Sequence, residues 1–269
     1  MTWAAPTGEP QHHVALRPGD VGRYVLLPGD PGRVERIASR FDNPRFVARN
    51  REYVTWTGEL DGVAVSCTST GIGCPSAAIA VEELIRCGAD TFIRVGTSGG
   101  MQPGMRTGEL AIITAAIRDE GTTSHYLPME YPALADIDVV DALREAARRT
   151  GALARLGVSQ SKDSFYGEVE PERMPIADEL AARWKAWVRG GAVSSEMEAA
   201  AIFIVAAIAR VRAGGIMVCA GAPDMTREEA EASMKDFSID PVIDAAVEGL
   251  RVLIARDRAT GGPAAAPAR

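Results

Sequence analysis

Three arginines stand beside glycine-rich turns, where their guanidinium groups could hold an anion together. Arg94 lies near the end of the β-branched run TFIRV, just before VGTSGG, and Arg33 closes the turn PGDPGR. Arg51 precedes another strand-like run in ARNREYVTW. A guanidinium is a planar, permanently charged fork of donors that matches the oxygens of a phosphate dianion. Each arginine alone could be a surface or salt-bridged residue, but jointly, with the Thr97 hydroxyl, they predict a phosphate site.

Arg94 sits inside a run that is apolar enough to be buried, and burying an unpaired cation is costly. Its guanidinium therefore needs either a carboxylate from the same chain or an anionic ligand. The sequence leaves both partners open at this point.

Two glutamates occur two residues apart in SSEMEAA, directly before an apolar segment. On extended chain Glu196 and Glu198 point the same way, whereas on a helix they diverge. One interpretation is that this stretch only starts the helix, with Ser194 or Ser195 as its N-cap. The other is that a carboxylate faces a pocket and accepts hydrogen bonds from neighbouring hydroxyls, as a ribose 2′,3′-diol would offer.

Glycine-rich segments follow three apolar runs, at 28–33, 69–76 and 95–100. Ligands of α/β proteins bind at the carboxyl ends of strands, where such turns lie, and exposed N–H groups there form anion-binding nests. Taken alone, each turn could be a tight connection. The segment TGIGCPS nearly matches the dinucleotide fingerprint, but Ser76 replaces its third glycine and Pro75 lies inside it. We therefore predict no nicotinamide cofactor.

The elements that must position these residues alternate along the chain. Apolar runs predict strands at 24–28, 53–60, 63–69, 91–95, 109–117, 155–161 and 215–221. Segments with helical periodicity predict helices at 75–88, 138–151 (capped by Asp138), 196–211 and 241–255. The Asp61–Gly62 pair is typical of a two-residue hairpin. This alternation predicts an α/β layered domain, and the hairpin makes its sheet mixed.

The 269 residues, 46% of them hydrophobic, are enough for one large core. We expect a flexible N-terminus at 1–12, a single domain at 13–256 and a disordered tail rich in Pro, Ala and Gly at 257–269. A net charge of −7 argues against a nucleic-acid binder.

The cysteines and the apolar runs indicate the compartment. Cys67, Cys74, Cys87 and Cys219 form no CxxC pair and no metal spacing, so we expect buried thiols in a reducing cytosol. The start MTWAAPTGEPQHH is not a secretion signal, and the longest apolar run is too short to span a bilayer. These features predict a soluble, cytoplasmic protein without membrane contact.

Six motifs occur together in a characteristic order: LPGDPGRVERIA, NREYVTWTGEL, STGIGCPSAAIAVEEL, FIRVGTSGGMQPG, KDSFYGE and SSEMEAAAIF. Across residues 12–256 the chain resembles the nucleoside phosphorylase superfamily of the hexameric type, and within it the uridine phosphorylases most. The resemblance implies a three-layer α/β/α fold around a mixed, partly barrel-like central sheet. It also implies dimers that share active sites, assembled as three dimers into a hexamer.

The implied reaction is reversible phosphorolysis, in which a nucleoside and phosphate give a free base and ribose 1-phosphate without a cofactor. An oxocarbenium-like state forms on the ribose, and phosphate stabilises it and attacks the opposite face, so no covalent nucleophile is needed. The protein supplies positioning and electrostatics. Phosphate thus becomes the expected partner of Arg94.

The resemblance also assigns residues to ligands. Those matching the phosphate site are Gly29, Arg33, Arg94 and Thr97, with Arg51 contributed to the partner subunit's site. Those matching the ribose site are Met197 and Glu198, with His13 contributed in the same way. Those matching a monovalent cation site, which holds potassium at the dimer interface, are Glu52, Ile72 and Ser76. Phe165 matches the aromatic residue beside the base.

Base recognition is where this sequence departs from the family pattern. Uridine phosphorylases place a glutamine and an arginine, or a lysine and a histidine, around the pyrimidine. Lys162 is present here, but Glu168 and Val169 stand where the glutamine and the histidine are expected. Asp224 resembles the aspartate with which purine nucleoside phosphorylases protonate their base, a catalytic role that requires a raised pKa. Its alternative is a loop aspartate that caps the next helix.

Arg94, Glu198 and Asp224 are therefore the catalytic candidates, and Phe165, Lys162 and Glu168 the base-binding ones. Uridine is the expected substrate, with a purine or modified nucleoside as the alternative. A hydrolytic nucleosidase would also fit the scaffold, although water as acceptor does not need the full arginine set. A non-catalytic nucleoside-binding protein would fit too, although the presence of Arg94, Thr97 and Glu198 argues against it, and a turnover assay decides.

Overall fold

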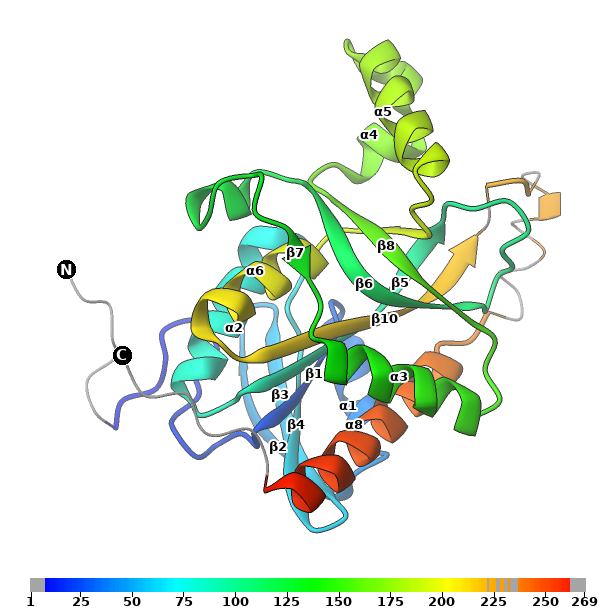
Figure 1. Ribbon diagram of the computed structural model, residues 1–269. Helices are drawn as coiled ribbons and strands as arrows, with labels where there is room; N and C mark the ends of the chain where they lie inside the picture. The colour runs from blue at the N-terminus through cyan, green and yellow to red at the C-terminus, as the bar shows by residue number, and fades with distance from the viewer. Residues whose placement is uncertain (1–7, 222, 226–227, 230–231, 233–236, 262–269) are drawn as a thin grey trace.

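The computed structural model describes residues 8–221, 223–225, 228–229, 232 and 237–261 of the chain. One mixed sheet runs through the centre, in the strand order β10-β6-β8-β9-β5-β1-β4-β3-β2. Because β10 pairs with both β6 and β5, the segment from β10 to β5 closes on itself as a barrel, and the remaining strands extend from it. The expected α/β fold with a partly barrel-like sheet is confirmed (Figure 1).

The strands are β1 (Tyr24–Leu27), β2 (Asp42–Asn50), β3 (Tyr53–Leu60), β4 (Val63–Thr68), β5 (Thr91–Gly100), β6 (Leu110–Asp119), β7 (Ala133–Leu134), β8 (Ala154–Lys162), β9 (Ser194–Glu196) and β10 (Arg212–Gly221). The helices are α1 (Val34–Ala38), α2 (Cys74–Arg86), α3 (Ile137–Arg149), α4 (Phe165–Val169), α5 (Ala177–Arg189), α6 (Ala199–Ala209) and α8 (Asp240–Thr260). Short 3-10 turns are η1 (Pro31–Arg33), η2 (Thr122–His125) and η3 (Pro171–Arg173).

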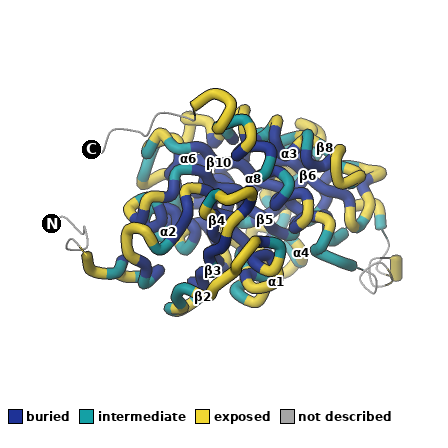
Figure 2. Tube along the Cα trace, turned by 90° about the horizontal axis from the view of Figure 1, so that it is seen from below, coloured by how far each residue is buried: buried dark blue, intermediate teal, exposed yellow. Residues whose placement is uncertain are grey.

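Two hydrophobic clusters cover opposite faces of the sheet, which makes three layers. Helices α2 and α6 pack on one face, and α1, α3 and α8 pack on the other. The buried chain concentrates along the central strands, as Figure 2 shows. Helix α6 is apolar all round because most of it lies inside the protein. The α4–α5 segment instead projects from the body of the fold (Figure 1), and no residue of α5 is fully buried.

Several expected elements are confirmed, and the β3–β4 hairpin is the clearest case. Asp61 and Gly62 have φ values of 52° and 73°, and Leu60 pairs with Val63 on either side of them. Two left-handed residues give the turn whose twist matches that of the strands, which is why an Asp-Gly pair predicted it.

The prediction of a third glycine-rich turn at 95–100 is wrong, because this segment continues strand β5. Residues Thr97 and Ser98 pair with β10, and Gly99 and Gly100 pair with β9. The glycines are there for close packing: a Cβ on Gly100 would lie 2.8 Å from the Cys219 sulfur.

Helix starts differ from the expected ones where another side chain provides the cap. Helix α3 begins at Ile137, and its cap is Asp136 rather than Asp138, since the Asp136 carboxylate accepts from the N–H groups of Asp138 and Val139. Helix α6 begins only at Ala199, because 194–196 form strand β9 between β5 and β8.

Ordered structure extends into both terminal segments that were expected to be flexible or disordered. Helix α8 runs to Thr260, so the domain boundary expected at 256 falls inside it, and Asp257 is held by Arg212 at 2.6 Å and by the Tyr24 hydroxyl at 2.5 Å. At the other end Gln11 is buried, and its backbone N–H donates to Leu16 O. Residues 1–7 and 262–269 lie outside the described residues. The division into a single domain stays a prediction.

All four cysteines are free and buried, as expected, and burial raises the pKa of each thiol. Among the described residues, no helix has the length and hydrophobicity that a bilayer crossing requires.

Candidate active site

A cavity of about 770 Å³ opens where β1 and β4 end, beside the second half of β5, and it gathers most of the candidate residues. These three strands run parallel in the order β4-β1-β5, so the segments that follow β1 and β4 meet the extended part of β5 at one edge. The candidates that line the cavity are Gly29, Arg33, Glu52, Ile72, Ser76, Arg94, Thr97, Lys162, Phe165, Glu168, Met197 and Glu198.

Arg94 is only 4% exposed and is held by two carboxylates of its own chain. Its Nε donates to Glu196 Oε2 at 2.7 Å, and its Nη2 pairs with Glu198 Oε2. Its third nitrogen, Nη1, is buried and has no hydrogen-bond partner within the described part of the chain. The guanidinium is therefore held by two carboxylates of its own chain, where phosphate was the expected partner, and it still keeps a donor for a ligand.

The unpartnered Nη1 of Arg94 points towards the first glycine-rich turn, since a Cβ on Gly29 would lie 3.9 Å from it. Arg33 follows this turn and lies 3.6 Å from Asp30, whose carboxylate also accepts from Gly32 N. Burial lowers the pKa of Arg33, and the nearby positive charge of Arg94 contributes to the same lowering. Two guanidiniums that repel one another at a cavity wall favour an anion between them.

The two glutamates of SSEMEAA have separate roles. Glu196 starts helix α6: its Oε2 accepts from the backbone N–H groups of Glu198 and Ala199, at 2.8 and 2.9 Å. Its Oε1 accepts from the Ser161 hydroxyl at 2.5 Å. The expectation that Ser194 or Ser195 would cap the helix is wrong, because both serines lie in strand β9 and bond across it.

Glu198 faces the cavity and is held from two sides. Its Oε1 accepts from the Gly73 N–H at 2.7 Å, in the second glycine-rich turn, and its Oε2 pairs with Arg94. Burial raises the pKa of Glu198, although Arg94 opposes that rise. A buried, oriented carboxylate of this kind can accept hydrogen bonds from a diol.

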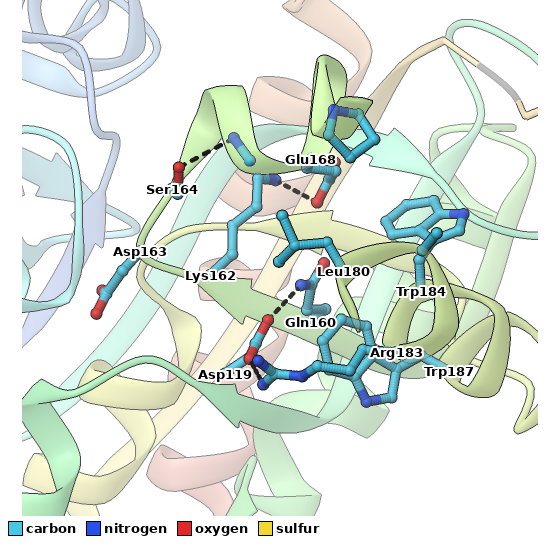
Figure 3. A pocket seen from close by; sticks show the side chains of 13 residues that line it. Asp119, Gln160, Lys162, Asp163, Ser164, Glu168, Leu180, Arg183, Trp184 and Trp187 are labelled. Carbon is cyan, nitrogen blue, oxygen red and sulfur yellow. Dashed lines mark hydrogen bonds and ion pairs between the residues drawn. The ribbon is translucent and has the colours of Figure 1, made fainter. Parts of the chain in front are cut away.

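Lys162 and Glu168, which both line the cavity, form an ion pair, with Nζ 3.0 Å from Oε2. Lys162 ends strand β8, and Glu168 lies on the short helix α4. Phe165, at the start of α4, also lines the cavity and is 53% exposed. A second cavity of about 430 Å³ lies against the same ion pair, between the sheet and helix α5 (Figure 3).

Glu52, Ile72 and Ser76, the residues expected to hold a monovalent cation, line the same cavity. The Ser76 hydroxyl donates to Glu52 Oε1 at 2.9 Å, and its own oxygen also lies against Thr70 O. Hydrogen bonds, first from its own backbone N–H, lower the pKa of Glu52. A charged carboxylate beside hydroxyl and carbonyl oxygens is the donor set that a hard cation takes. The described residues contain no cluster of three or more His, Cys, Asp or Glu side chains fit for a metal ion.

Three candidates do not reach the cavity. Asp224 lies in a separate hollow near Arg106 and accepts from the Gly104 N–H at 3.1 Å, so this arrangement gives its catalytic role no support. Arg51 lies between β2 and β3 with a φ of 54°. The Nδ1 of His13 is 2.7 Å from Glu83 Oε1. For Arg51 and His13 the expected contact is with another subunit.

Sequence reasoning missed the groups that hold the candidates in place. No sequence pattern predicted that these groups would be contacts of the candidate residues. They are the Gly73 N–H, the Ser161 hydroxyl and the Ser195–Gln160 hydrogen bond. Only Glu196 carried a signal, its spacing from Glu198, and that spacing fitted two interpretations.

Comparisons with known proteins agree with this geometry. A sequence model of the phosphorylase superfamily matches residues 23–251. The uridine phosphorylase of Treponema pallidum (strain Nichols) is 47% identical over 92% of this chain and 95% of its own length. The uridine phosphorylase of Thermococcus kodakarensis is 48% identical over 85% of this chain and 83% of its own length. The guanosine phosphorylase of Halorubrum lacusprofundi is 41% identical over 78% of this chain and 83% of its own length. Ordered motifs, a partly closed mixed sheet and these matches lead to one conclusion: the chain belongs to the phosphorylase superfamily.

Proposed function

We propose that this protein catalyses the reversible phosphorolysis of uridine to uracil and ribose 1-phosphate. The observation that carries the proposal is Arg94, whose buried Nη1 has no described partner and points at the Gly29 turn beside Arg33. The names of the relatives at 47% and 48% identity support the choice of uridine. Phosphate is the co-substrate, and the reaction needs no cofactor.

In the proposed reaction Arg94, Arg33, Thr97 and the Gly29 backbone hold the phosphate. The bond from the ribose C1′ to the base breaks with its electron pair going to the base, and positive charge develops on the ribose. A phosphate oxygen then forms the new bond to C1′ from the opposite face. Glu198 and Met197 fix the ribose, so that the reacting atoms are held in line.

The proposal includes subunit sharing. Arg51 would reach the phosphate, and His13 the ribose, in the active site of a partner subunit, within a hexamer made of three dimers. Their position outside this chain's own cavity is what such sharing requires. The cytoplasmic location expected from the sequence stays a prediction.

A monovalent cation, potassium, is proposed at Glu52, Ile72 and Ser76, on the same cavity wall. We expect activity to rise when sodium is exchanged for potassium at constant ionic strength, and the rise to vanish in Glu52→Gln. Equal rates in both salts would argue against the cation.

A purine nucleoside is the second candidate, because one relative is named a guanosine phosphorylase. Ultraviolet assays of uridine, thymidine, inosine and adenosine, each with and without phosphate, separate the possibilities. Phosphate-dependent uracil release would support the proposal. Purine release would move the enzyme to the purine branch and make Asp224 the first residue to mutate. Release without phosphate would indicate a nucleosidase, and no release from any of them a binding protein or an unusual nucleoside.

A further inference from the structure

Glu83 is a buried carboxylate of helix α2 that has no part in the proposed reaction so far. Its side chain is 8% exposed, and it shares the buried part of α2 with Ala80 and Leu84. Burying a carboxylate is costly unless hydrogen-bond donors surround it. The donors come from the N-terminal segment, which lies against α2 (Figure 1). The contacts of Glu83 with this segment therefore account for a charge at a buried helix position.

Three N–H groups of the N-terminal segment converge on the Glu83 carboxylate. The backbone N–H groups of His13 and Val14 donate to its Oε2 at 2.9 and 2.8 Å. The ring Nδ1 of His13 lies 2.7 Å from Oε1. Because a carboxylate only accepts hydrogen bonds, Nδ1 carries a proton and donates it to this contact. A neutral imidazole has a single N–H, so the other ring nitrogen, Nε2, is left as an acceptor.

The His13 ring is also fixed in orientation. Val14 is fully buried in the hydrophobic cluster that includes α2, and Asn50 Nδ2 donates to His13 O at 2.8 Å. The ring of His12 lies nearly perpendicular to that of His13, with 4.7 Å between the centroids. The His13 side chain is 34% exposed, and no described residue forms a hydrogen bond with Nε2. This edge of the ring can therefore meet a group from outside the chain.

We propose that Glu83 is a positioning residue that keeps the ring proton of His13 on Nδ1, so that Nε2 accepts a hydrogen bond from the ribose 5′-hydroxyl in the partner's site. The inference rests on the proposed function. Glu198 can take the 2′,3′-diol, and the base and phosphate meet at C1′, so the 5′-hydroxyl is the ribose hydroxyl left for His13. Glu83 thereby selects nucleosides whose 5′ group is a donor, and it acts in the active site of another chain.

Solid-state nitrogen-15 NMR tests the proton arrangement without any substrate. The chain has 3 histidines, so labelling histidine alone gives few ring signals, and those of His13 are the ones missing from His13→Gln. At about pH 8, above the range in which an imidazole ordinarily takes up its second proton, we expect a protonated Nδ1 and an unprotonated Nε2. A wild-type ring with a proton on Nε2 overturns the inference.

Glu83→Gln should reverse this arrangement. The backbone N–H groups that donate to Oε2 hold the amide oxygen there, so the amide NH2 faces Nδ1 in place of Oε1. Nδ1 must then accept, and the ring proton should move to Nε2. The same NMR signals report the reversal, and a variant ring that keeps its proton on Nδ1 would show that Glu83 does not set it.

The effect on specificity is measured with uridine and 5′-deoxy-5′-fluorouridine, whose fluorine cannot donate a hydrogen bond. We expect the wild type to favour uridine in kcat/KM by about tenfold, the size of effect that one lost hydrogen bond produces. In Glu83→Gln the Nε2–H can face the fluorine, and the uridine hydroxyl can turn to accept, so the preference should fall by at least about threefold. The KM for phosphate should stay unchanged. Loosening of the N-terminal segment alone would instead weaken both substrates equally.

Glu82→Gln is the matched control, because Glu82 is the neighbouring glutamate on α2 and its side chain is 41% exposed. It should keep the wild-type preference. If uridine is cleaved with phosphate but Glu83→Gln also keeps that preference, the inference is overturned and the proposed function survives. If the wild type cleaves no nucleoside, the proposed function fails, and the NMR signals alone decide whether Glu83 sets the ring proton.

Mixed dimers test whether Glu83 acts in the partner's site. When Glu83→Gln is refolded with an excess of Arg94→Ala, most active sites take His13 from a chain whose Glu83 is intact. The wild-type preference for uridine should therefore return. A preference that stays at the Glu83→Gln value would place the action of Glu83 in its own chain's site and contradict the inference.

Discussion

Arg94 combines two demands that usually conflict. A buried guanidinium needs carboxylates to offset its desolvation, yet a phosphate ligand needs donors that are still free. Here Glu196 and Glu198 take Nε and Nη2, and Nη1 is left over. The arrangement holds the cation in place before phosphate arrives, so little reorganisation remains for the reaction itself.

The two glutamates beside Arg94 should separate stability from activity. Burial raises the pKa of Glu198, so the cost of its charge offsets part of what its ion pair with Arg94 contributes, and Glu198→Gln should lower the melting temperature less than Glu196→Gln does. Its kcat/KM for uridine should fall on the order of 10²–10³, the loss typical of one preorganised contact. Glu196→Gln should instead lower the unfolding free energy by about 1 kcal/mol or more, since it weakens the start of α6. Equal effects of the two variants on stability and rate would contradict this assignment.

At the residue scale, the sequence was most informative where a residue type and a glycine-rich segment coincide. Arg33, Arg94 and Thr97 each neighbour glycines in ordered motifs, and all three line the cavity. Glu196 was not predictable, because a carboxylate before a helix fits both a cap and a pocket. Asp224 was selected by resemblance alone, and it lies in another hollow.

At the scale of elements, strand β5 carries the site because its glycines let β10 and the Arg94 side chain lie close. A Cβ on Gly96 would come within 2.9 Å of the Met217 sulfur and 3.1 Å of Arg94 Nη2. Residue 96 therefore has to lack a side chain for the Arg94 guanidinium to occupy this position.

Gly96→Ala should displace the guanidinium and raise the KM for phosphate several-fold, with an overpacking cost of about 1–3 kcal/mol in unfolding free energy. Steady-state kinetics and urea unfolding measure the two effects. Gly221→Ala is the matched control at the end of β10, since a Cβ there meets no atom of a described residue within 4 Å. A phosphate KM that stays at the wild-type value in Gly96→Ala would argue against this role.

Helix α8 is fastened to the sheet by the Tyr24–Asp257–Arg212 contacts, and this makes stability depend on alkaline pH. Burial, helped by the hydrogen bond to Asp257, raises the pKa of Tyr24 from 10.0 to about 12. The folded state thus favours the protonated phenol, and the gain is complete below pH 10 and lost as pH rises towards 12. The urea midpoint should fall more steeply over this window in the wild type than in Tyr24→Phe. Parallel slopes would show that the phenol does not contribute.

Long buried elements were predictable from periodicity, and exposed or interrupted ones were not. Strand β2 has no apolar alternation, contains Pro44 and has Asn43 at a φ of 49°. Helix α5 buries no residue completely, so its sequence pattern does not distinguish it from a surface loop. Helix α6 and the hairpin carried strong local signals and were found.

At the scale of the whole molecule, the single chain leaves the proposed site without two of its residues. Arg51 and His13 do not line its own cavity, and the α4–α5 segment projects from the fold (Figure 1). Association into site-sharing dimers would complete the site. Light scattering should then give a mass near six chains of 28.5 kDa.

Mixing two inactive variants tests subunit sharing directly. Arg51→Ala and Arg94→Ala should each lose most activity alone. In a mixed dimer one of the two sites receives an intact Arg94 from one chain and an intact Arg51 from the other. About half of the dimers are mixed when equal amounts of the two variants are unfolded and refolded together, so about a quarter of the wild-type sites should be restored. The control is each variant refolded by itself. Failure of the mixture to exceed either variant would place Arg51 outside a shared site.

The most direct test of the central claim follows the ribose product by phosphorus-31 NMR. Purified protein is incubated with uridine and inorganic phosphate, and uracil is measured in the same sample. The account predicts one ribose 1-phosphate per uracil released, with the inorganic phosphate signal decreasing equally. Uracil accompanied by free ribose and an unchanged phosphate signal would contradict it, because water would then be the acceptor and the Arg94 site would hold no reactant.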